Sequence, residues 1–133
     1  MPSFGKRSRE RLDTCDERLQ KLFEQVVKDF DCSILEGHRS QQRQDQLFRE
    51  NKSQVKWPNG KHNTTPSMAV DVAPYPVDWK DINQFYHFAG YVRGVARMMD
   101  IELRFGGDWD GDYEVADETF KDLPHFELRD PQA

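Results

Sequence analysis

A short alternating segment framed by prolines constrains the fold of this 133-residue chain more than any other feature. Over residues 68–73 larger apolar residues alternate with small residues and one aspartate, which is the period of two typical of a β-strand. Pro74 and Pro76 should end that strand, because proline cannot continue a ladder of backbone hydrogen bonds. The alternation places Asp71 on a face whose other members are alanines. That face therefore has room for an ion or a substrate.

Apolar residues recur at spacings of three and four over residues 8–30, which indicates the buried face of an amphipathic helix. Ser8 could cap its start, and Asp13 or Asp16 could cap a second start within the segment. The segment is therefore either one helix or a short helix followed by a longer one. The expected buried residues are Leu12, Cys15, Leu19, Leu22, Phe23, Val26, Val27 and Phe30.

Two more helices are expected further along the chain. Ser40 is a plausible N-cap for a helix over residues 41–50, and Asp81 for a longer helix over residues 82–99. Residues 51–66 indicate a loop, because their prolines and glycine discourage regular structure. The expected buried side of the longer helix consists of Ile82, Phe85, Tyr86, Ala89, Val92, Val95, Ala96 and Met99.

Three further strands complete the expected fold, at residues 32–36, 101–105 and 125–128. In the last of these, the two apolar side chains face one way while His125 and Glu127 face the other. Helices and strands in this order predict an α+β domain with a small antiparallel β-sheet and flanking helices.

Size and charge limit the partners that the chain can have. Its length suits one domain over residues 1–133. The chain has 24 acidic and 19 basic residues, and its net charge of −5 has the wrong sign for a protein bound mainly to phosphates. We therefore expect no nucleic-acid partner. No segment approaches the length of a transmembrane helix, so we also expect no stable membrane association.

The chain has two cysteines, Cys15 and Cys32. Two cysteines provide neither a disulfide framework nor a cysteine zinc motif, so we expect buried free thiols, which suit a reducing cytosol. The basic N-terminus lacks the apolar stretch of a signal peptide.

His62, Asp71 and His125 are candidate metal ligands. His62 lies in a loop of small polar residues, and Asp71 follows nine residues later on a strand, so the two could converge from opposite sides of a bend. His125 opens the last strand and could join them across the sheet. Two histidines and one carboxylate are a known way to leave one position on zinc open for water. A turn at Pro124 could bring Asp122 to the same side, where a carboxylate can move protons.

Several motifs follow one another in the chain. They are residues 36–40 (EGHRS) with Gln44, residues 61–76 (KHNTTPSMAVDVAPYP), residues 104–109 (RFGGDW) and residues 122–128 (DLPHFEL). Together they resemble the D-Ala-D-Ala carboxypeptidase-like zinc peptidases, with their S-x-H…A-x-D and G-x-R-S-x-x-x-Q elements. More narrowly, they resemble the bacteriophage endolysins of that family that act as L-alanyl-D-glutamate peptidases. The resemblance covers nearly the whole chain and implies a hedgehog-like or DD-peptidase-like fold.

The resemblance implies that His62, Asp71 and His125 bind one zinc ion. It also implies that Asp122 is the general base and that Arg39 contacts the substrate or the oxyanion. A guanidinium stays charged and offers a fixed fork of donors, which suits that role. The alternative for Arg39 is a surface salt bridge.

The chain departs from the family pattern at two positions. Gly60 stands where the family often has serine, which puts the rigidity of the loop in question, and Asp122 stands where it often has glutamate. Three further residues are weaker candidates: Trp109 could line the cleft, Asp108 could orient a ligand histidine, and Gln44 could bind substrate or support another residue.

The acidic loop over residues 108–118 holds six acidic residues and no basic one. The pattern suggests calcium, but Gly111 and Thr119 are misplaced for an EF-hand loop. A solvated flap is the alternative. Asp117 and Glu118 belong to this expectation.

The candidate site and the resemblance together predict a monomeric zinc metallopeptidase of peptidoglycan, with no separate cell-wall-binding domain. The resemblance, and not the residue spacing, implies that it cuts the L-Ala–D-Glu bond as a phage endolysin in host lysis. A D-Ala-D-Ala carboxypeptidase is one alternative, and a non-catalytic zinc-containing module that binds cell wall or protein is another. We expect the protein to stay in the host cytoplasm until a membrane pore releases it to the cell wall.

Overall fold

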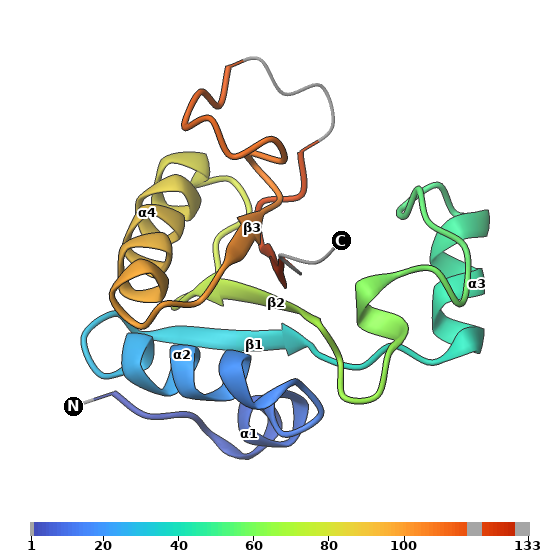
Figure 1. Ribbon diagram of the computed structural model, residues 1–133, viewed down its shortest axis with the longest axis horizontal. Coiled ribbons are helices and arrows are strands. Elements are labelled where there is room, and N and C mark those ends of the chain that lie inside the picture. The colour runs from blue at the N-terminus through green and yellow to red at the C-terminus, as the bar shows by residue number, and fades with distance from the viewer. Residues whose placement is uncertain (1, 117–120, 130–133) are drawn as a thin grey trace.

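Four antiparallel strands form one sheet in the order β1-β2-β4-β3 in the computed structural model, which describes residues 2–116 and 121–129 (Figure 1). The strands are β1 (Cys32–Glu36), β2 (Ala69–Pro74), β3 (Leu103–Phe105) and β4 (His125–Leu128). The helices are α1 (Lys6–Leu12), α2 (Glu17–Val27), α3 (Gln41–Arg49) and α4 (Ile82–Met98), with a 3₁₀ turn η1 at Lys61–Asn63. The predicted α+β fold with a small antiparallel sheet is confirmed.

Side-chain caps set the starts of three helices. Asp16 accepts a hydrogen bond from a backbone N–H two residues on, at 2.9 Å, and so separates α1 from α2. Ser40 and Asp81 cap α3 and α4 by accepting a hydrogen bond from the backbone N–H three residues on, at 3.2 Å in both cases. Ser8 was a wrong candidate, because it lies inside α1. Its hydroxyl instead accepts a hydrogen bond from the backbone N–H of Ile34 at 3.0 Å, which ties α1 to β1.

One face of the sheet carries the hydrophobic core. Val70, Phe126 and Phe105 are neighbours across β2, β4 and β3. The rings of Phe105 and Phe126 stack with their centroids 5.4 Å apart. Phe23 of α2 and Phe88 of α4 each meet Phe126 edge-on. These two helices therefore cover the core face, and the burial of their aromatic rings holds the sheet in place.

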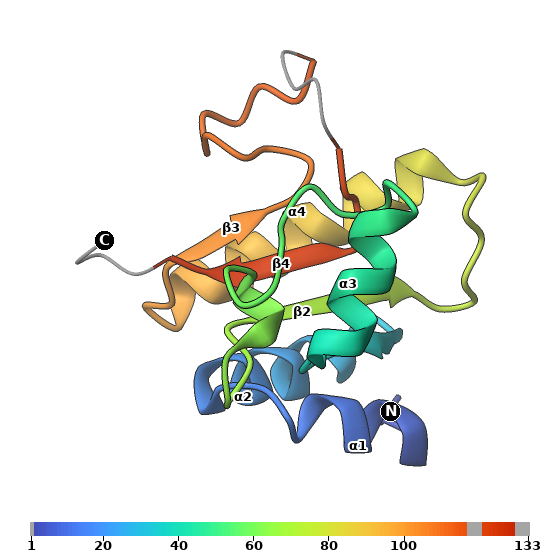
Figure 2. The ribbon, with the colours of Figure 1, turned by 90° about the vertical axis from the view of Figure 1, so that its right-hand side faces the viewer.

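The opposite face of the sheet carries polar side chains. Asp71 pairs with His125 across β2 and β4, and Ala69 pairs with Glu127 in the same ladder. Arg104 of β3 pairs with Glu127 from the other side. Figure 2 shows α3 and η1 in front of the strands and α4 behind them. Since α4 covers the core face, the polar face of the sheet is turned toward α3 and η1.

Three details of the sequence prediction are corrected by the structure. Ile82 is 47% exposed, because it occupies the first turn of α4, while Phe88 is buried on that helix. Strand β2 lies one residue later than the predicted 68–73, since it begins at Ala69 and ends at Pro74, which faces Cys32. Strand β3 begins at Leu103 rather than two residues earlier.

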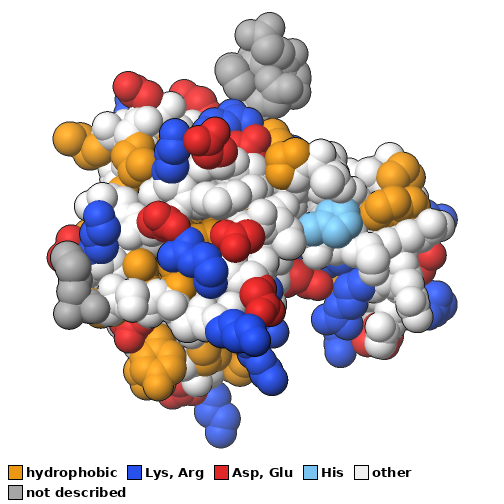
Figure 3. Space-filling view, turned by 90° about the horizontal axis from the view of Figure 1, so that it is seen from below, with side chains coloured by type: hydrophobic (Ala, Val, Ile, Leu, Met, Phe, Trp, Pro, Cys, Tyr) orange, Lys and Arg blue, Asp and Glu red, His pale blue; other side chains and the backbone are white. Residues whose placement is uncertain are grey.

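The surface seen from below, on the side of α1 and α2, mixes charges of both signs (Figure 3). Lys and Arg side chains are interspersed with Asp and Glu side chains over this face. Within residues 2–116 and 121–129, no helix is both long and apolar enough to cross a lipid bilayer.

Candidate active site

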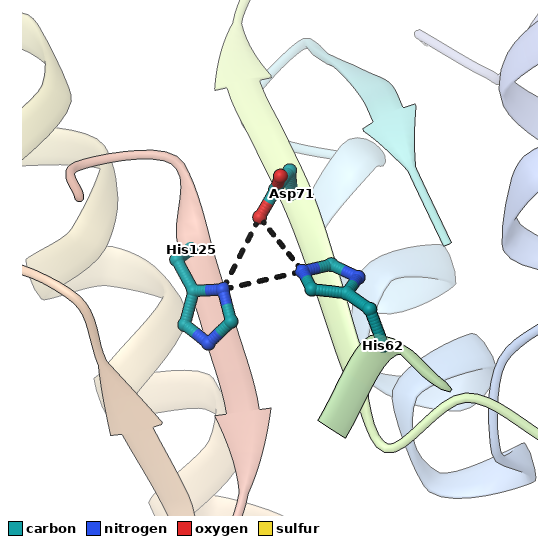
Figure 4. A group of neighbouring side chains, drawn as sticks. All are labelled: His62, Asp71 and His125. Carbon is teal, nitrogen blue, oxygen red and sulfur yellow. Dashed lines mark hydrogen bonds and ion pairs between the residues drawn. The ribbon is translucent and has the colours of Figure 1, made fainter. Parts of the chain in front are cut away.

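His62, Asp71 and His125 point toward one another from η1, β2 and β4 (Figure 4). Oδ1 of Asp71 lies 3.3 Å from Nε2 of His62 and 3.3 Å from Nδ1 of His125. The two histidine nitrogens are also 3.3 Å apart. Three side-chain atoms that could each bind a metal, from remote parts of the chain, therefore form a nearly equilateral triangle.

Backbone contacts fix the orientation of His62. Its Nδ1 lies 2.8 Å from the carbonyl oxygen of Gly37, so a proton on Nδ1 leaves Nε2 free to face Asp71. The carbonyl oxygen of His62 accepts a hydrogen bond from the backbone N–H of Arg39 at 2.7 Å. A Cβ atom at Gly37 would clash with the carbonyl oxygen of Arg11, so the close approach of Gly37 to α1 requires glycine.

The loop that carries His62 is held in place without the family's serine. Oδ1 of Asn63 accepts a hydrogen bond from the backbone N–H of Gly60 at 2.9 Å. The amide nitrogen of Asn63 donates to the carbonyl oxygen of Arg39 at 3.2 Å. Asn63 thus supplies side-chain contacts that help to stabilise this loop.

The electrostatics of the triangle favour a cation. Burial acts to raise the pKa of Asp71, but the imidazoles of His125 and His62 outweigh it and hold that pKa well below its usual range. Burial opposes charge on His125, yet Asp71 and Glu127 raise its pKa to about 9. Within the described part of the chain, Oδ1 of Asp71 is buried without a well-formed hydrogen bond. The three residues could hold a metal ion.

Asp122 lies beside the triangle at the start of a tight turn that ends at His125. The backbone N–H of His125 donates to the carbonyl oxygen of Asp122 at 3.0 Å, so the turn expected at Pro124 forms. Oδ2 of Asp122 lies 3.9 Å from Nδ1 of His125. Burial, followed by the charge of Asp71, raises the pKa of Asp122. Gly106 packs against this turn, and a Cβ atom there would clash with the Asp122 carbonyl oxygen.

Arg39 lies in the wall of the site rather than on the surface, since its side chain is only 11% exposed. Its Nε and one terminal nitrogen donate to Glu36 Oε1 at 3.1 and 2.8 Å. Its other terminal nitrogen donates to Gln44 Oε1 at 3.0 Å. The guanidinium lies 3.5 Å from Oδ2 of Asp71. Gln44 itself is fully buried and also bonds to Ser53, so it supports Arg39 and the following loop from inside the protein.

Trp109 and Asp108 occupy different positions relative to the histidines. The ring of Trp109 lies 5.3 Å from that of His125 and lines the cleft. Asp108 is buried and accepts hydrogen bonds from Arg93 at 2.9 Å and from the backbone N–H of Tyr113 at 2.8 Å. The expectation that Asp108 orients a ligand histidine receives no support from these partners.

The contact with a histidine that was expected of Asp108 is made by Glu127 instead. The sequence alone had not indicated a role for Glu127. Its Oε1 lies 2.8 Å from Nε2 of His125. The alternation of β4 placed both side chains on one face, which was the available signal.

The acidic loop brings three carboxylates together. Oxygens of Asp108, Asp110 and Asp112 lie within 4.8 Å of one another, although exposed acidic groups often gather without an ion. Desolvation and the neighbouring carboxyls raise the pKa of Asp110 to about 6. Asp117 and Glu118, which were part of the calcium expectation, lie outside the described residues.

A cleft of about 380 Å³ opens on the histidine side of the triangle. Asp122, Trp109 and both histidines line it together with a basic group. That group consists of Arg39, Lys52, Lys61 and Arg104. The cleft thus joins possible metal ligands, a carboxylate that can move protons and cationic side chains.

Residues 2–129 match the model of the phage L-alanyl-D-glutamate peptidase family. The chain belongs to this family. It is 32% identical to the L-alanyl-D-glutamate peptidase of Escherichia phage T5 over 134 residues, which cover 94% of this chain and 96% of that protein. It also resembles the crystal structure of the L-Ala D-Glu endopeptidase ChiX of Serratia marcescens, with a TM-score of 0.77 and 30% identity. That match covers 95% of this chain and 89% of the other.

Membership of the phage L-alanyl-D-glutamate peptidase family confirms the resemblance inferred from the four motifs. The chain is therefore an enzyme of the hydrolase class. Residues 36–40, 61–76 and 122–128, which carry three of these motifs, meet at the cleft.

Proposed function

We propose that this family member is a zinc-dependent endopeptidase that hydrolyses the L-Ala–D-Glu bond of peptidoglycan stem peptides and serves a phage as its endolysin. The observation that carries the proposal is the triangle of His62 Nε2, Asp71 Oδ1 and His125 Nδ1, with each pair 3.3 Å apart. The choice of bond rests on the likeness to the peptidases of phage T5 and Serratia marcescens.

The triangle has the dimensions of a tetrahedral zinc site. Ligand atoms about 2.0–2.1 Å from zinc at tetrahedral angles lie about 3.3–3.4 Å from one another. The observed spacing supports zinc without a large rearrangement, and three protein ligands leave a fourth position open, as in catalytic sites. Zinc held there would polarise the scissile carbonyl and lower the pKa of a water molecule.

Asp122 is the proposed general base. Its carboxylate lies beside the triangle. In this position it can take a proton from the attacking water and later donate it to the leaving amine. Asp122 is not needed as a ligand in this arrangement.

Arg39 is the proposed stabiliser of negative charge. Glu36 and Gln44 hold its guanidinium in one orientation, so little reorganisation is needed when charge develops on the carbonyl oxygen. Because Arg39 also faces Asp71, its position depends on the same strand that carries a metal ligand.

Mass spectrometry of fragments released from purified peptidoglycan tests the proposed reaction. New N-terminal D-Glu supports the endopeptidase, while release of free D-Ala alone indicates a carboxypeptidase. Asp122→Ala tests for the non-catalytic module, since that variant should keep the fold and metal but lose turnover. Unchanged biological activity of Asp122→Ala would favour the binding module.

Calcium is a separate prediction for the acidic loop. The clustering of Asp108, Asp110 and Asp112 supports it, whereas the bond from Arg93 to Asp108 competes with a cation. Calorimetry that detects no heat on calcium addition would remove this prediction.

We further propose that the enzyme acts as a monomer and stays in the host cytoplasm until a membrane pore opens. Light scattering on the protein as it elutes from a size-exclusion column measures its molar mass and so tests for a monomer. Fractionation of infected cells before and after pore formation tests the location.

A further inference from the structure

Glu127 contacts a proposed metal ligand, His125, at the ring nitrogen that faces away from Asp71 and His62. Its Oε1 lies 2.8 Å from Nε2 of His125, while Nδ1 of the same ring faces Asp71 and His62. Both side chains are buried. If Nε2 carries the ring proton and donates it to Glu127, the lone pair of Nδ1 is left for a cation.

The register of the sheet determines this contact. Glu127 lies two residues after His125 on β4, so both side chains project from the same face. Its partner on β2 is Ala69, whose methyl group leaves space for the carboxylate. A larger residue at that position would compete with Glu127 for the space beside the imidazole.

The second oxygen of Glu127 faces two basic side chains. Oε2 lies 3.5 Å from Nζ of Lys61 and 3.8 Å from a terminal nitrogen of Arg104. Lys61 also donates a hydrogen bond to the carbonyl oxygen of Leu128. Since Lys61 directly precedes His62, these contacts connect the turn that carries one histidine to the strand that carries the other.

We propose that Glu127 is a positioning residue that holds His125 in the orientation and tautomer needed to bind the metal through Nδ1, with Lys61 and Arg104 holding Glu127 in turn. The proposal rests on the metal site of the proposed function. Carboxylates that accept the outer N–H of a metal-bound histidine fix the ring and strengthen it as a ligand.

The proposal predicts a loss of metal affinity. Glu127→Ala should bind zinc about 10- to 100-fold more weakly in competition with a chromophoric chelator, because loss of such a partner has effects of this size. Glu127→Gln should lose less zinc affinity, since its amide oxygen can still accept a hydrogen bond from the N–H of His125. Glu102→Ala, a change at an exposed carboxylate just before β3, should bind zinc like the wild type.

A spectroscopic measurement separates positioning from general stability. With cobalt in place of zinc, Glu127→Ala should change the visible absorption of the bound ion, which reports its ligand geometry, while Glu102→Ala should leave the spectrum unchanged. Circular dichroism of the metal-free proteins identifies variants that do not fold. If Glu127→Ala does not fold, Glu127→Gln carries the comparison.

The outcomes distinguish this inference from the proposed function. Weaker zinc binding and an altered cobalt spectrum in folded Glu127 variants support the positioning role. Wild-type affinity and an unchanged spectrum in Glu127→Ala would overturn it while leaving the metal site intact. Failure of the wild-type protein itself to bind zinc or cobalt would overturn the metal site first.

Discussion

Asp71 and His125 are directly opposed partners on β2 and β4, and Oδ1 of the aspartate lies 3.3 Å from Nδ1 of the histidine. The pairing of two strands therefore sets the distance between two proposed metal ligands. A shift of one residue in this register would put the two side chains on opposite faces of the sheet. The hydrophobic pairs on the other face, such as Val70 with Phe126, oppose such a shift.

Replacing Asp122 should abolish turnover without unfolding the protein. We expect Asp122→Ala to lower kcat by about 10²- to 10⁴-fold, the usual contribution of a positioned general base. Zinc content and the thermal midpoint should stay near the wild-type values. The exposed Asp13 provides a matched control, and equal kcat values for Asp13→Ala and Asp122→Ala would contradict the role.

Arg39 should not tolerate lysine. Arg39→Lys retains the charge but loses the fork that engages Glu36 and Gln44, so we expect kcat to fall on the order of 10²-fold. Steady-state kinetics on purified peptidoglycan measures this effect. Arg97→Lys, at an exposed position of α4, should have wild-type kinetics. A fully active Arg39→Lys enzyme would limit Arg39 to a structural ion pair.

The aromatic cluster under the sheet should dominate stability. Phe126 is fully buried against rings from α2, β3 and α4, so Phe126→Ala should lower the free energy of unfolding by about 3–5 kcal/mol. Urea denaturation measures the change. Met98→Ala is the control because Met98 is 86% exposed. Similar losses for both variants would show that the cluster does not carry the stability.

Stability should fall at alkaline pH because of the two buried thiols. Burial raises the pKa of both Cys15 and Cys32 to about 12, whereas an unfolded cysteine titrates near about 8.5. Between these values the unfolded chain releases protons that the folded chain keeps. The contribution of each thiol is therefore complete below the unfolded pKa and is lost as pH rises, by up to about 1.4 kcal/mol per pH unit.

Urea denaturation across this alkaline range measures the effect of the thiols. Other groups also titrate there, so the comparison is with the Cys15→Ala/Cys32→Ala double variant, whose stability should decline less steeply. Identical slopes for the two proteins would show that the thiols do not contribute.

Local patterns were enough to predict much of the fold. The alternation from His125 to Leu128 and the caps at Ser40 and Asp81 depend on neighbours within a few residues, and the structure contains all of them. The turn before His125 was also local, since Pro124 restricts the backbone there. The resemblance to a family supplied the grouping of the three proposed ligands, which spacing alone left open.

Tertiary contacts set the limits of the sequence prediction. The period of α4 could not show that Ile82 lies beyond the packed part of the helix. Asp108 meets Arg93, fifteen residues away on α4, rather than a histidine. Glu127 shared a face with His125 in the prediction. Its contact with Arg104 depends on the register of β3 and β4, and its contact with Lys61 depends on the position of η1, and no local pattern contains either.

Metal content and turnover, measured on the same protein, test the central claim most directly. Elemental mass spectrometry should find one zinc ion per wild-type chain and none bound to Asp71→Ala, and chelation should abolish peptidoglycan cleavage until zinc is restored. Full cleavage by chelated wild-type protein that retains no metal would contradict the account.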